Sequence, residues 1–196
     1  MGIGQPSTAI MVATVGEFEM SILVQGDRNA AGCEDAAKEI AAELARRHVE
    51  VNLGAYGKLV EVFLQAGCRA TCHGHRADDR GKCPAETPFV DCTVGGSLSK
   101  EEAWGRRLGI FLESDAFLFF AGNEGTLAHL IPVLAFASKS WHDKKKIALV
   151  GWNSVQVGWV SEEVLALTKL LGGLPSSVVF FEINVDPKTV VDFLTS

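Results

Sequence analysis

From Ser114 to Thr126 the chain reads SDAFLFFAGNEGT, and this stretch carries the strongest indication of the fold. The consecutive apolar residues Ala116 to Phe120 cannot belong to a strand with one wet face, because alternate side chains of a strand point to opposite faces. We therefore expect this strand to be covered on both sides, as in a doubly wound sheet. A glycine turn follows it directly, and residues 126 to 139 are predicted to form a helix.

Short apolar runs alternate with helical patterns along the rest of the chain. Strands are predicted at Ser21–Val24, Val49–Leu53, Arg69–Cys72, Ile147–Val150 and Ser177–Phe181, and helices at Cys33–His48, before Ala66, through Trp104–Phe111, at Ser161–Leu171 and after Asp186-Pro187. Residues 73 to 98 lack a clear period and are interpreted as a long loop. Alternating strands and helices are typical of a parallel sheet. The prediction is a doubly wound, three-layer α/β sandwich with a mainly parallel sheet of six or seven strands.

The composition suits one globular domain with a sizeable core, since 47% of the 196 residues are hydrophobic and 21% are charged. We expect the domain to span residues 21–196 and residues 1–20 to form an arm or an extra strand. The net charge of −6 argues against a nucleic-acid binder. No apolar run reaches the roughly eighteen residues that a membrane span needs. Without a secretory leader pattern, the cysteines are expected to be reduced thiols of a cytoplasmic protein.

Three glycine turns follow three predicted strands: Gly26-Asp27, Gly54-Ala55-Tyr56-Gly57 and Gly122-Asn123-Glu124-Gly125-Thr126. Ligands of open parallel sheets bind at the carboxyl ends of the strands, near a reversal of strand order. A helix start offers free N–H groups and a positive dipole end, which favour phosphate. One such turn is also common without any ligand, but three in a small domain favour a binding site. The predicted phosphate- and nucleotide-binding residues are Gly26, Asp27, Gly54, Tyr56, Gly57, Gly122, Asn123, Gly125 and Thr126.

The chain contains neither the dinucleotide fingerprint G-x-G-x-x-G after a strand nor a P-loop. The ligand is therefore expected to be a mononucleotide or sugar phosphate, and no cofactor is predicted. Cysteines and histidines gather between residues 68 and 92, at Cys68, Cys72, His73, His75, Cys83 and Cys92. Because these residues lack the C-x-x-C spacing of a zinc knuckle, we predict no metal site.

The stretch from Ser114 to Thr126 resembles the SDAxxxxPGGxGT motif of the Lonely Guy group, often labelled lysine-decarboxylase-like. Val24-Gln25-Gly26, Gly54 to Glu61 and Trp141 to Lys144 are similar to further segments of that group, in the same order. The resemblance implies a Rossmann-like homodimer that binds nucleoside monophosphates. It also implies phosphoribohydrolase activity, in which the N-glycosidic bond is cleaved and the base released. Ala121 and Asn123 replace the Pro and the second Gly of the motif.

The resemblance also points to catalytic residues. Arg106 matches a catalytic Arg of the group, and the adjacent Arg107 stands where the group has Lys. His129 occupies the place of the essential Glu, and an imidazole cannot place negative charge beside an oxocarbenium-like ribose. It could instead move a proton or simply pack. Glu124 is an additional carboxylate that either points away from the turn or takes over the missing role. The predicted catalytic residues are Arg106, Glu124 and His129.

Three functions follow as hypotheses. The first is a divergent phosphoribohydrolase that acts on an AMP-like nucleotide. The second is a non-catalytic carrier or sensor of a nucleotide or of the molybdenum cofactor, with the same fold. The third is an obligate dimer whose pocket is vestigial. The expected partners are a small-molecule nucleotide and a second copy of the chain, with no nucleic acid and no membrane.

Overall fold

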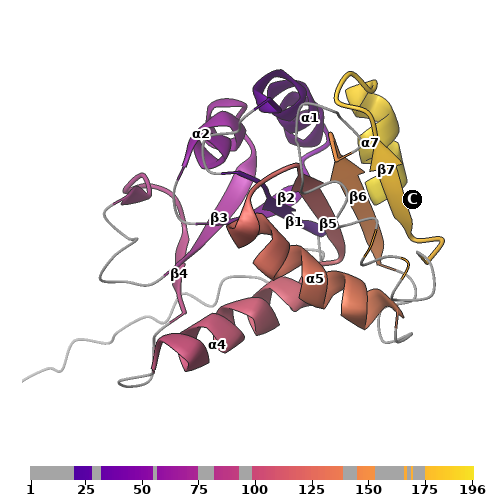
Figure 1. Cartoon of the computed structure of the whole chain (residues 1–196). Coiled ribbons are helices and arrows are strands. Elements are labelled where there is room, and N and C mark those ends of the chain that lie inside the picture. The colour runs from indigo at the N-terminus through magenta and orange to yellow at the C-terminus, as the bar shows by residue number, and fades with distance from the viewer. Residues whose placement is uncertain are drawn as a thin grey trace, which may run out of the picture.

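A computed structural model describes residues 20–27, 32–54, 57–74, 82–92, 99–138, 145–152, 166, 169 and 175–196 (Figure 1). The strands are β1 (Ser21–Gln25), β2 (Glu50–Gly54), β3 (Arg69–Gly74), β4 (Phe89–Asp91), β5 (Ala116–Phe120), β6 (Lys146–Val150) and β7 (Val178–Phe181). The helices are α1 (Glu34–Arg46), α2 (Lys58–Gln65), α4 (Lys100–Glu113), α5 (Glu124–Ser138) and α7 (Pro187–Leu194).

The seven strands form one sheet in the order β4-β3-β2-β1-β5-β6-β7, and every neighbouring pair is parallel. The chain runs from β1 outward to β4 and then returns to the other side of β1 to build β5, β6 and β7. The strand order therefore reverses between β1 and β5, where Ile22 lies opposite Ala116 and Gln25 opposite Phe119. The predicted doubly wound parallel sheet is confirmed.

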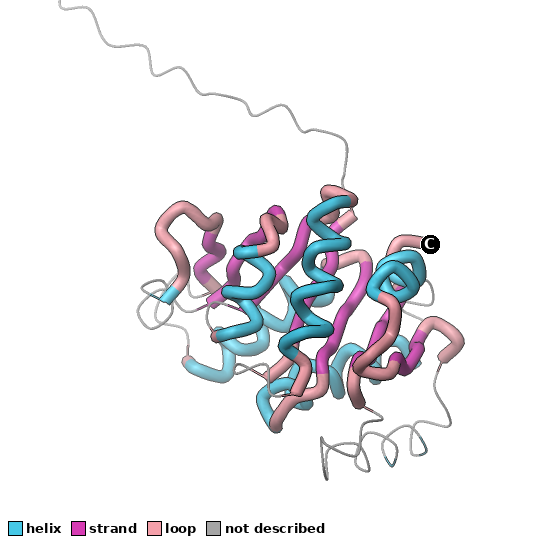
Figure 2. The backbone as a smooth tube through the Cα atoms, turned by 90° about the horizontal axis from the view of Figure 1, so that it is seen from above, coloured by secondary structure: helices cyan, strands magenta, loops and turns pink. Residues whose placement is uncertain are grey.

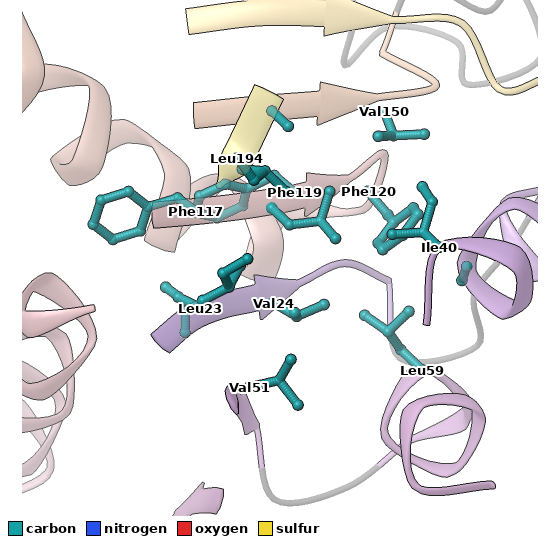
Figure 3. Packing of buried hydrophobic residues seen from close by; sticks show 14 of the residues in the cluster. Leu23, Val24, Ile40, Val51, Leu59, Phe117, Phe119, Phe120, Val150 and Leu194 are labelled. Carbon is teal, nitrogen blue, oxygen red and sulfur yellow. The ribbon is translucent and has the colours of Figure 1, made fainter. Parts of the chain in front are cut away.

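Helices cover both faces of the sheet. Figure 1 shows α1, α2 and α7 on the upper face of the sheet and α4 and α5 on the lower face. Figure 2, seen from above, shows that the helices of the upper layer run along the strands they cover. Every residue of β5 is buried, as the apolar run of that strand predicts. Figure 3 shows the side chains of β1, β5 and the surrounding elements packed together. Burial of each large apolar side chain stabilises such a core by roughly 1.5–3 kcal/mol.

The predicted long loop over residues 73–98 is wrong in part. His73 and Gly74 complete β3, and Phe89–Asp91 form β4, which pairs with β3 from Cys72↔Phe89 to Gly74↔Asp91. A strand of three residues between Pro88 and Cys92 is too short to display an alternating pattern, so periodicity could not reveal it. The predicted arm falls outside the described residues except for Met20, as does most of the predicted helix at Ser161–Leu171.

Helix α4, on the second face of the sheet, begins at a well-defined cap. Ser99 precedes α4, and its hydroxyl accepts a hydrogen bond from the Glu102 amide at 3.2 Å while the Glu102 carboxylate accepts one from the Ser99 amide at 2.8 Å. This reciprocal capping box fixes the start of α4. Helix α5 begins immediately after the turn that follows β5. Among the described helices, none is long and apolar enough to cross a membrane.

Candidate functional site

The three glycine turns lie at one edge of the sheet. They follow β1, β2 and β5, which are adjacent in the order β2-β1-β5, and parallel strands place their carboxyl ends together. The prediction that these turns cluster at the strand-order reversal is confirmed. Gly57, with φ of 109°, adopts a conformation that favours glycine and leads into α2. Ala55 and Tyr56 lie outside the described residues.

Gly122 brings the turn after β5 directly against the turn after β1. A Cβ atom at Gly122 would collide with the Thr126 side chain and would lie 2.8 Å from the Asp27 backbone nitrogen. On the neighbouring turn, a Cβ atom at Gly26 would lie 3.0 Å from Cβ of Phe120. Both glycines are therefore needed so that the backbones of the two turns can approach each other.

The Gly125 and Thr126 amides at the start of α5 already have partners. The Asn123 side-chain oxygen accepts a hydrogen bond from the Gly125 amide at 3.0 Å, and the Asn123 carbonyl accepts one from the Thr126 amide at 2.9 Å. The Asn123 side-chain nitrogen in turn donates to the Asp27 carboxylate at 2.7 Å. Residues 123–125 are exposed, so the turn is open to solvent. An anion that approached the start of α5 would have to displace the Asn123 amide and would meet the Asp27 carboxylate.

Thr126 is the buried member of the predicted phosphate-binding set. Only 2% of its surface is exposed, and its hydroxyl has no hydrogen-bond partner among the residues that the structure describes. A buried hydroxyl without a partner costs free energy, because it has lost its bonds to water. The Thr126 hydroxyl lies against Gly122 beneath the turn, so a bound group reaches it only if the turn moves.

The two adjacent arginines of α4 point in different directions. Arg106 is exposed, whereas Arg107 is half-buried and its guanidinium lies 5.2 Å from the centre of the Phe111 ring. A Cβ atom at Gly54 would lie 3.2 Å from Nη2 of Arg107, so this guanidinium reaches the turn after β2. The resemblance to the Lonely Guy group predicted Arg106 as a catalytic residue, whereas the structure places Arg107 at the site. The sequence feature that could have indicated Arg107 is its spacing of four residues from Phe111, which places both on one helical face.

His129 lies between aromatic rings rather than beside a carboxylate. Its imidazole stacks on Trp104 at a centroid distance of 6.2 Å and meets the edge of Phe111 at 5.4 Å. Burial lowers the pKa of His129 to about 4, helped by the positive charge of Arg107 and opposed by the nearby Gly125 backbone. That backbone contact does not reach hydrogen-bond geometry, and neither ring nitrogen has a hydrogen-bond partner among the described residues. His129 is therefore neutral at neutral pH. The third predicted catalytic residue, Glu124, is exposed in the first turn of α5.

His73 is a site residue that the sequence suggested only as a possible zinc ligand. Its Nε2 lies 2.9 Å from the side-chain oxygen of Asn52, whose side-chain nitrogen donates to the Ser114 hydroxyl at 2.9 Å. Because the Asn52 oxygen can only accept, Nε2 carries the proton and Nδ1 keeps a lone pair. Burial first, and then the charge of Arg107, lower the pKa of His73 to about 4. Its buried Nδ1 has no partner within the described ranges.

The cysteines show no arrangement for a metal in the part of the chain that the structure describes, where no three His, Cys, Asp or Glu side chains gather around a common point. Cys68 instead donates to the Ala41 carbonyl at 3.2 Å. A cavity of about 360 Å³ lies at the opposite edge of the sheet, lined by Met20, Arg47, His48, Val49 and Thr195. Arg47 in that cavity is already paired with Glu43 and Asp192.

Comparison with protein-family models found no match, and comparison with curated proteins found none. Solved structures do match. The molybdenum cofactor binding protein from Rippkaea orientalis is 15% identical, with a TM-score of 0.60 over 90% of this chain and 96% of that one. A Northeast Structural Genomics Consortium target is 14% identical, with a TM-score of 0.59 over 90% and 99%. The Moco carrier protein from Chlamydomonas reinhardtii is 19% identical, with a TM-score of 0.55 over 90% and 98%. At these identities the likeness is one of fold: this chain has the three-layer α/β architecture of molybdenum cofactor carrier proteins.

Proposed function

We propose that this protein binds a phosphate-bearing heterocyclic molecule at the carboxyl edge of its sheet and holds it without cleaving it. The ligand class includes nucleoside monophosphates and phosphorylated pterins. The observation that carries the proposal is the state of His129, a neutral imidazole packed between Trp104 and Phe111 at the position where the resemblance expects a catalytic carboxylate.

Three features support binding at this edge. The turns after β1, β2 and β5 meet at the strand-order reversal, where open parallel sheets bind their ligands. Gly122 allows the backbones of two of these turns to approach each other closely. The third feature is chemical, because the edge carries the Arg107 guanidinium close to Gly54. A guanidinium suits a ligand with an anionic group.

The absence of a carboxylate at position 129 argues against hydrolysis. Cleavage of an N-glycosidic bond develops positive charge on the ribose, and glycosidases stabilise that charge with carboxylates. A neutral ring held between aromatic groups supplies none. The same site can bind a nucleotide without accelerating its cleavage, because binding energy that is equal in ground and transition states does not raise the rate.

The molybdenum cofactor fits this proposal as cargo. It is a phosphorylated pterin, and the carrier and binding proteins of similar fold are named for it. Arg107 would hold its phosphate-bearing part. Asp27 and Asn123 are hydrogen-bonded to each other at the turn, and their side chains would have to exchange this bond to meet the hydrogen-bonding edge of a pterin or purine.

Hydrolysis is the second candidate, and Glu124 is the observation that favours it. This carboxylate is exposed in the first turn of α5, at the edge where the ligand would lie. If it carries the missing role, the protein is a divergent phosphoribohydrolase of the Lonely Guy group. A hydrolase that depends on Glu124 would lose base release when the carboxylate is replaced by the amide of Glu124→Gln.

Thermal unfolding with and without ligand tests the proposal. AMP, a phosphorylated pterin and adenosine are each added to the full chain, and free base is measured in parallel. We expect the phosphorylated ligands to raise Tm, because a ligand at a hundred times its Kd stabilises the folded state by about 2.7 kcal/mol. We expect no release of adenine. Release that disappears in Glu124→Gln would establish the hydrolase instead, and no stabilisation by any ligand would remove the binding site altogether.

Thr126→Val is the matched variant for this experiment. Because the Thr126 hydroxyl has no partner within the described structure, its replacement by an isosteric methyl group removes no internal hydrogen bond. We expect the variant to be at least as stable as the wild type without ligand. If the hydroxyl contacts the ligand, the stabilisation by AMP should fall. An unchanged response to AMP would exclude Thr126 from the site.

A further inference from the structure

A line of aromatic rings runs from the exposed surface of α4 toward the sheet. The indole of Trp104 stacks on the imidazole of His129, with ring centroids 6.2 Å apart and ring planes at 15°. The imidazole in turn meets the edge of Phe111 at a centroid distance of 5.4 Å. Phe111 is fully buried, whereas 39% of the surface of Trp104 is exposed. Trp104 is therefore the outer end of this line of rings, and His129 covers one face of its indole.

The line of rings adjoins the candidate site. His129 lies one helical turn after Gly125, and its imidazole is close to the Gly125 backbone at the exposed start of α5. Helix α4 ends just before β5 begins, so its C-terminal end lies at the amino edge of the sheet and its first half lies toward the carboxyl edge. Arg107, three residues after Trp104, reaches Gly54 at the end of β2. The exposed indole consequently stands beside the edge at which the three glycine turns meet.

Small residues accompany Trp104 on the two helices. Gly105 and Gly109 are exposed on α4, and an added Cβ atom at either position would have nothing within 4 Å. On α5, Ala128 precedes His129 and is exposed as well. Glycine weakens the interior of a helix relative to alanine, so the stability of α4 does not account for Gly105 and Gly109. Their missing side chains leave room for a flat group beside the indole.

On this basis, and resting on the proposed function, we infer that Trp104 determines the specificity for the heterocycle, because the purine or pterin ring of the ligand stacks on its indole. The bound ring continues the stack that His129 begins. Stacking uses the face of a heterocycle and not its hydrogen-bonding edge, so one indole accepts both ring systems. A ligand that carries phosphate and sugar but no heterocycle gains nothing from Trp104.

A second copy of the chain is the other occupant that an exposed indole could meet. Within the described residues, Trp104 and Ile131 are the exposed large apolar side chains. A stable interface between proteins buries about 800 Å² on each partner around an apolar centre of several residues. Two side chains do not make such a centre, whereas a single planar ring is matched to a single indole. The surface of α4 therefore favours the heterocycle.

Calorimetry with AMP, adenosine and ribose 5-phosphate tests the inference. Trp104→Ala should weaken the binding of AMP and of adenosine on the order of tenfold to a hundredfold, as expected for the loss of one base–aromatic stack. Ribose 5-phosphate has no heterocycle, and its binding should stay unchanged. Trp104→Phe keeps an aromatic ring and should restore most of the affinity. Equal weakening of all three ligands in Trp104→Ala would overturn the inference.

Ile131→Ala is the matched control, because it removes a similarly exposed apolar side chain from α5. We expect it to leave the binding of all three ligands unchanged. Light scattering of Trp104→Ala identifies the other occupant. A fall in molar mass in that variant, but not in Ile131→Ala, would assign the indole to a contact between two copies and would overturn the inference.

Tryptophan fluorescence gives a signal that a merely structural role of Trp104 would not produce. AMP and adenosine should quench the emission of the wild type, because the bound ring stacks on the indole, and ribose 5-phosphate should not. Trp104→Phe should abolish this quenching while the buried Trp152, whose indole donates to the Phe119 carbonyl at 2.9 Å, still emits. Quenching of the same size in Trp104→Phe would contradict the inference.

These measurements also distinguish the two proposals. AMP that binds Trp104→Ala as tightly as the wild type would leave the proposed binding function intact and overturn the position of the heterocycle. If AMP, adenosine and a phosphorylated pterin all fail to bind the wild type, the proposed function fails and this inference fails with it.

Discussion

Gly122 is the residue on which the geometry of the candidate site depends most directly. Its backbone lies so close to the turn after β1 that a Cβ atom would be 2.8 Å from the Asp27 nitrogen and would also collide with Thr126. The contact with Asp27 involves backbone, which cannot rotate away as a flexible side chain can. Because Gly122 has a hydrogen atom where other residues have a Cβ atom, the turns after β1 and β5 can pack directly against each other.

We expect Gly122→Ala to lower the free energy of unfolding by about 1–3 kcal/mol, because the added methyl group forces the two turns apart. Gly109→Ala is the matched control. Gly109 lies on an exposed part of α4 with nothing within 4 Å of its missing side chain, so alanine there should stabilise the helix by about 0.5–1 kcal/mol. Urea unfolding of both variants measures the difference. A Gly122→Ala variant as stable as Gly109→Ala would show that the turns do not require this close approach.

Helix α4 is the element that carries Arg107, Phe111 and Trp104 to the site, and its first turn depends on the capping box of Ser99 and Glu102. Ser99→Ala removes the hydroxyl that accepts from the Glu102 amide, and we expect it to lower the free energy of unfolding by about 0.5–2 kcal/mol. Ser99→Asp keeps an acceptor at the cap and should be close to the wild type. Chemical denaturation of the two variants checks this, and equal stabilities of Ser99→Ala and Ser99→Asp would contradict a role for the cap.

Some helices and strands could be predicted from the sequence and others could not. The unbroken apolar run of β5 predicted a strand covered on both faces, because burial on two sides leaves no alternation. Asp186 and Pro187 predicted the start of α7, since capping chemistry is local. By contrast, β4 could not be found, because three residues at the edge of a sheet are held by pairing with β3 rather than by a pattern of their own.

The sequence predicted which turns form the candidate site but not the contacts between their side chains, because turns are local features and those contacts depend on the fold. The glycine turns are local signals, and adjacency of their strands follows once the sheet is doubly wound. The Asn123–Asp27 hydrogen bond joins residues from two turns far apart in sequence, and the approach of Arg107 to Gly54 depends on how α4 packs on the sheet. His73 looked like a metal ligand in the sequence, and only the fold places it beside Phe111 and Asn52.

At the scale of the whole molecule, the two buried histidines make stability depend on pH. Their folded-state pKa values are about 4, below the ordinary value of 6.5 that the unfolded chain regains. Between these two values the unfolded state binds more protons than the folded state, so the free energy of unfolding falls as the pH decreases from 6.5 toward 4. The contribution is fully present above pH 6.5 and is on the order of 3 kcal/mol per imidazole.

Urea unfolding between pH 7.5 and 5 measures this dependence. That range avoids the lower window in which Glu43 contributes, because hydrogen bonds from Arg46 and Arg47 lower the pKa of Glu43 from 4.5 to about 2. We expect stability to decrease steadily below pH 6.5 in the wild type and less steeply in His129→Phe. A wild type and a variant with the same pH dependence would mean that His129 is not buried in its neutral form.

The exposed apolar side chains of the molecule bear on whether two copies associate. Trp104 and Ile131 are large apolar side chains with 39% and 43% of their surface exposed, and they lie on α4 and α5, the helices of one layer. Contiguous exposed apolar patches mark contact surfaces, whereas single exposed apolar side chains are normal. The homodimer implied by the resemblance stays a prediction, which light scattering of the purified chain can test.

We expect a phosphate-bearing ligand to bind where the ends of β2, β1 and β5 meet. A crystal structure of the protein with AMP tests it most directly, because the position of the phosphorus atom is measured. We expect an intact nucleotide across these three turns, with its phosphate within hydrogen-bond distance of Arg107. A nucleotide bound elsewhere, such as in the cavity lined by Met20 and Arg47 at the opposite edge, would contradict it.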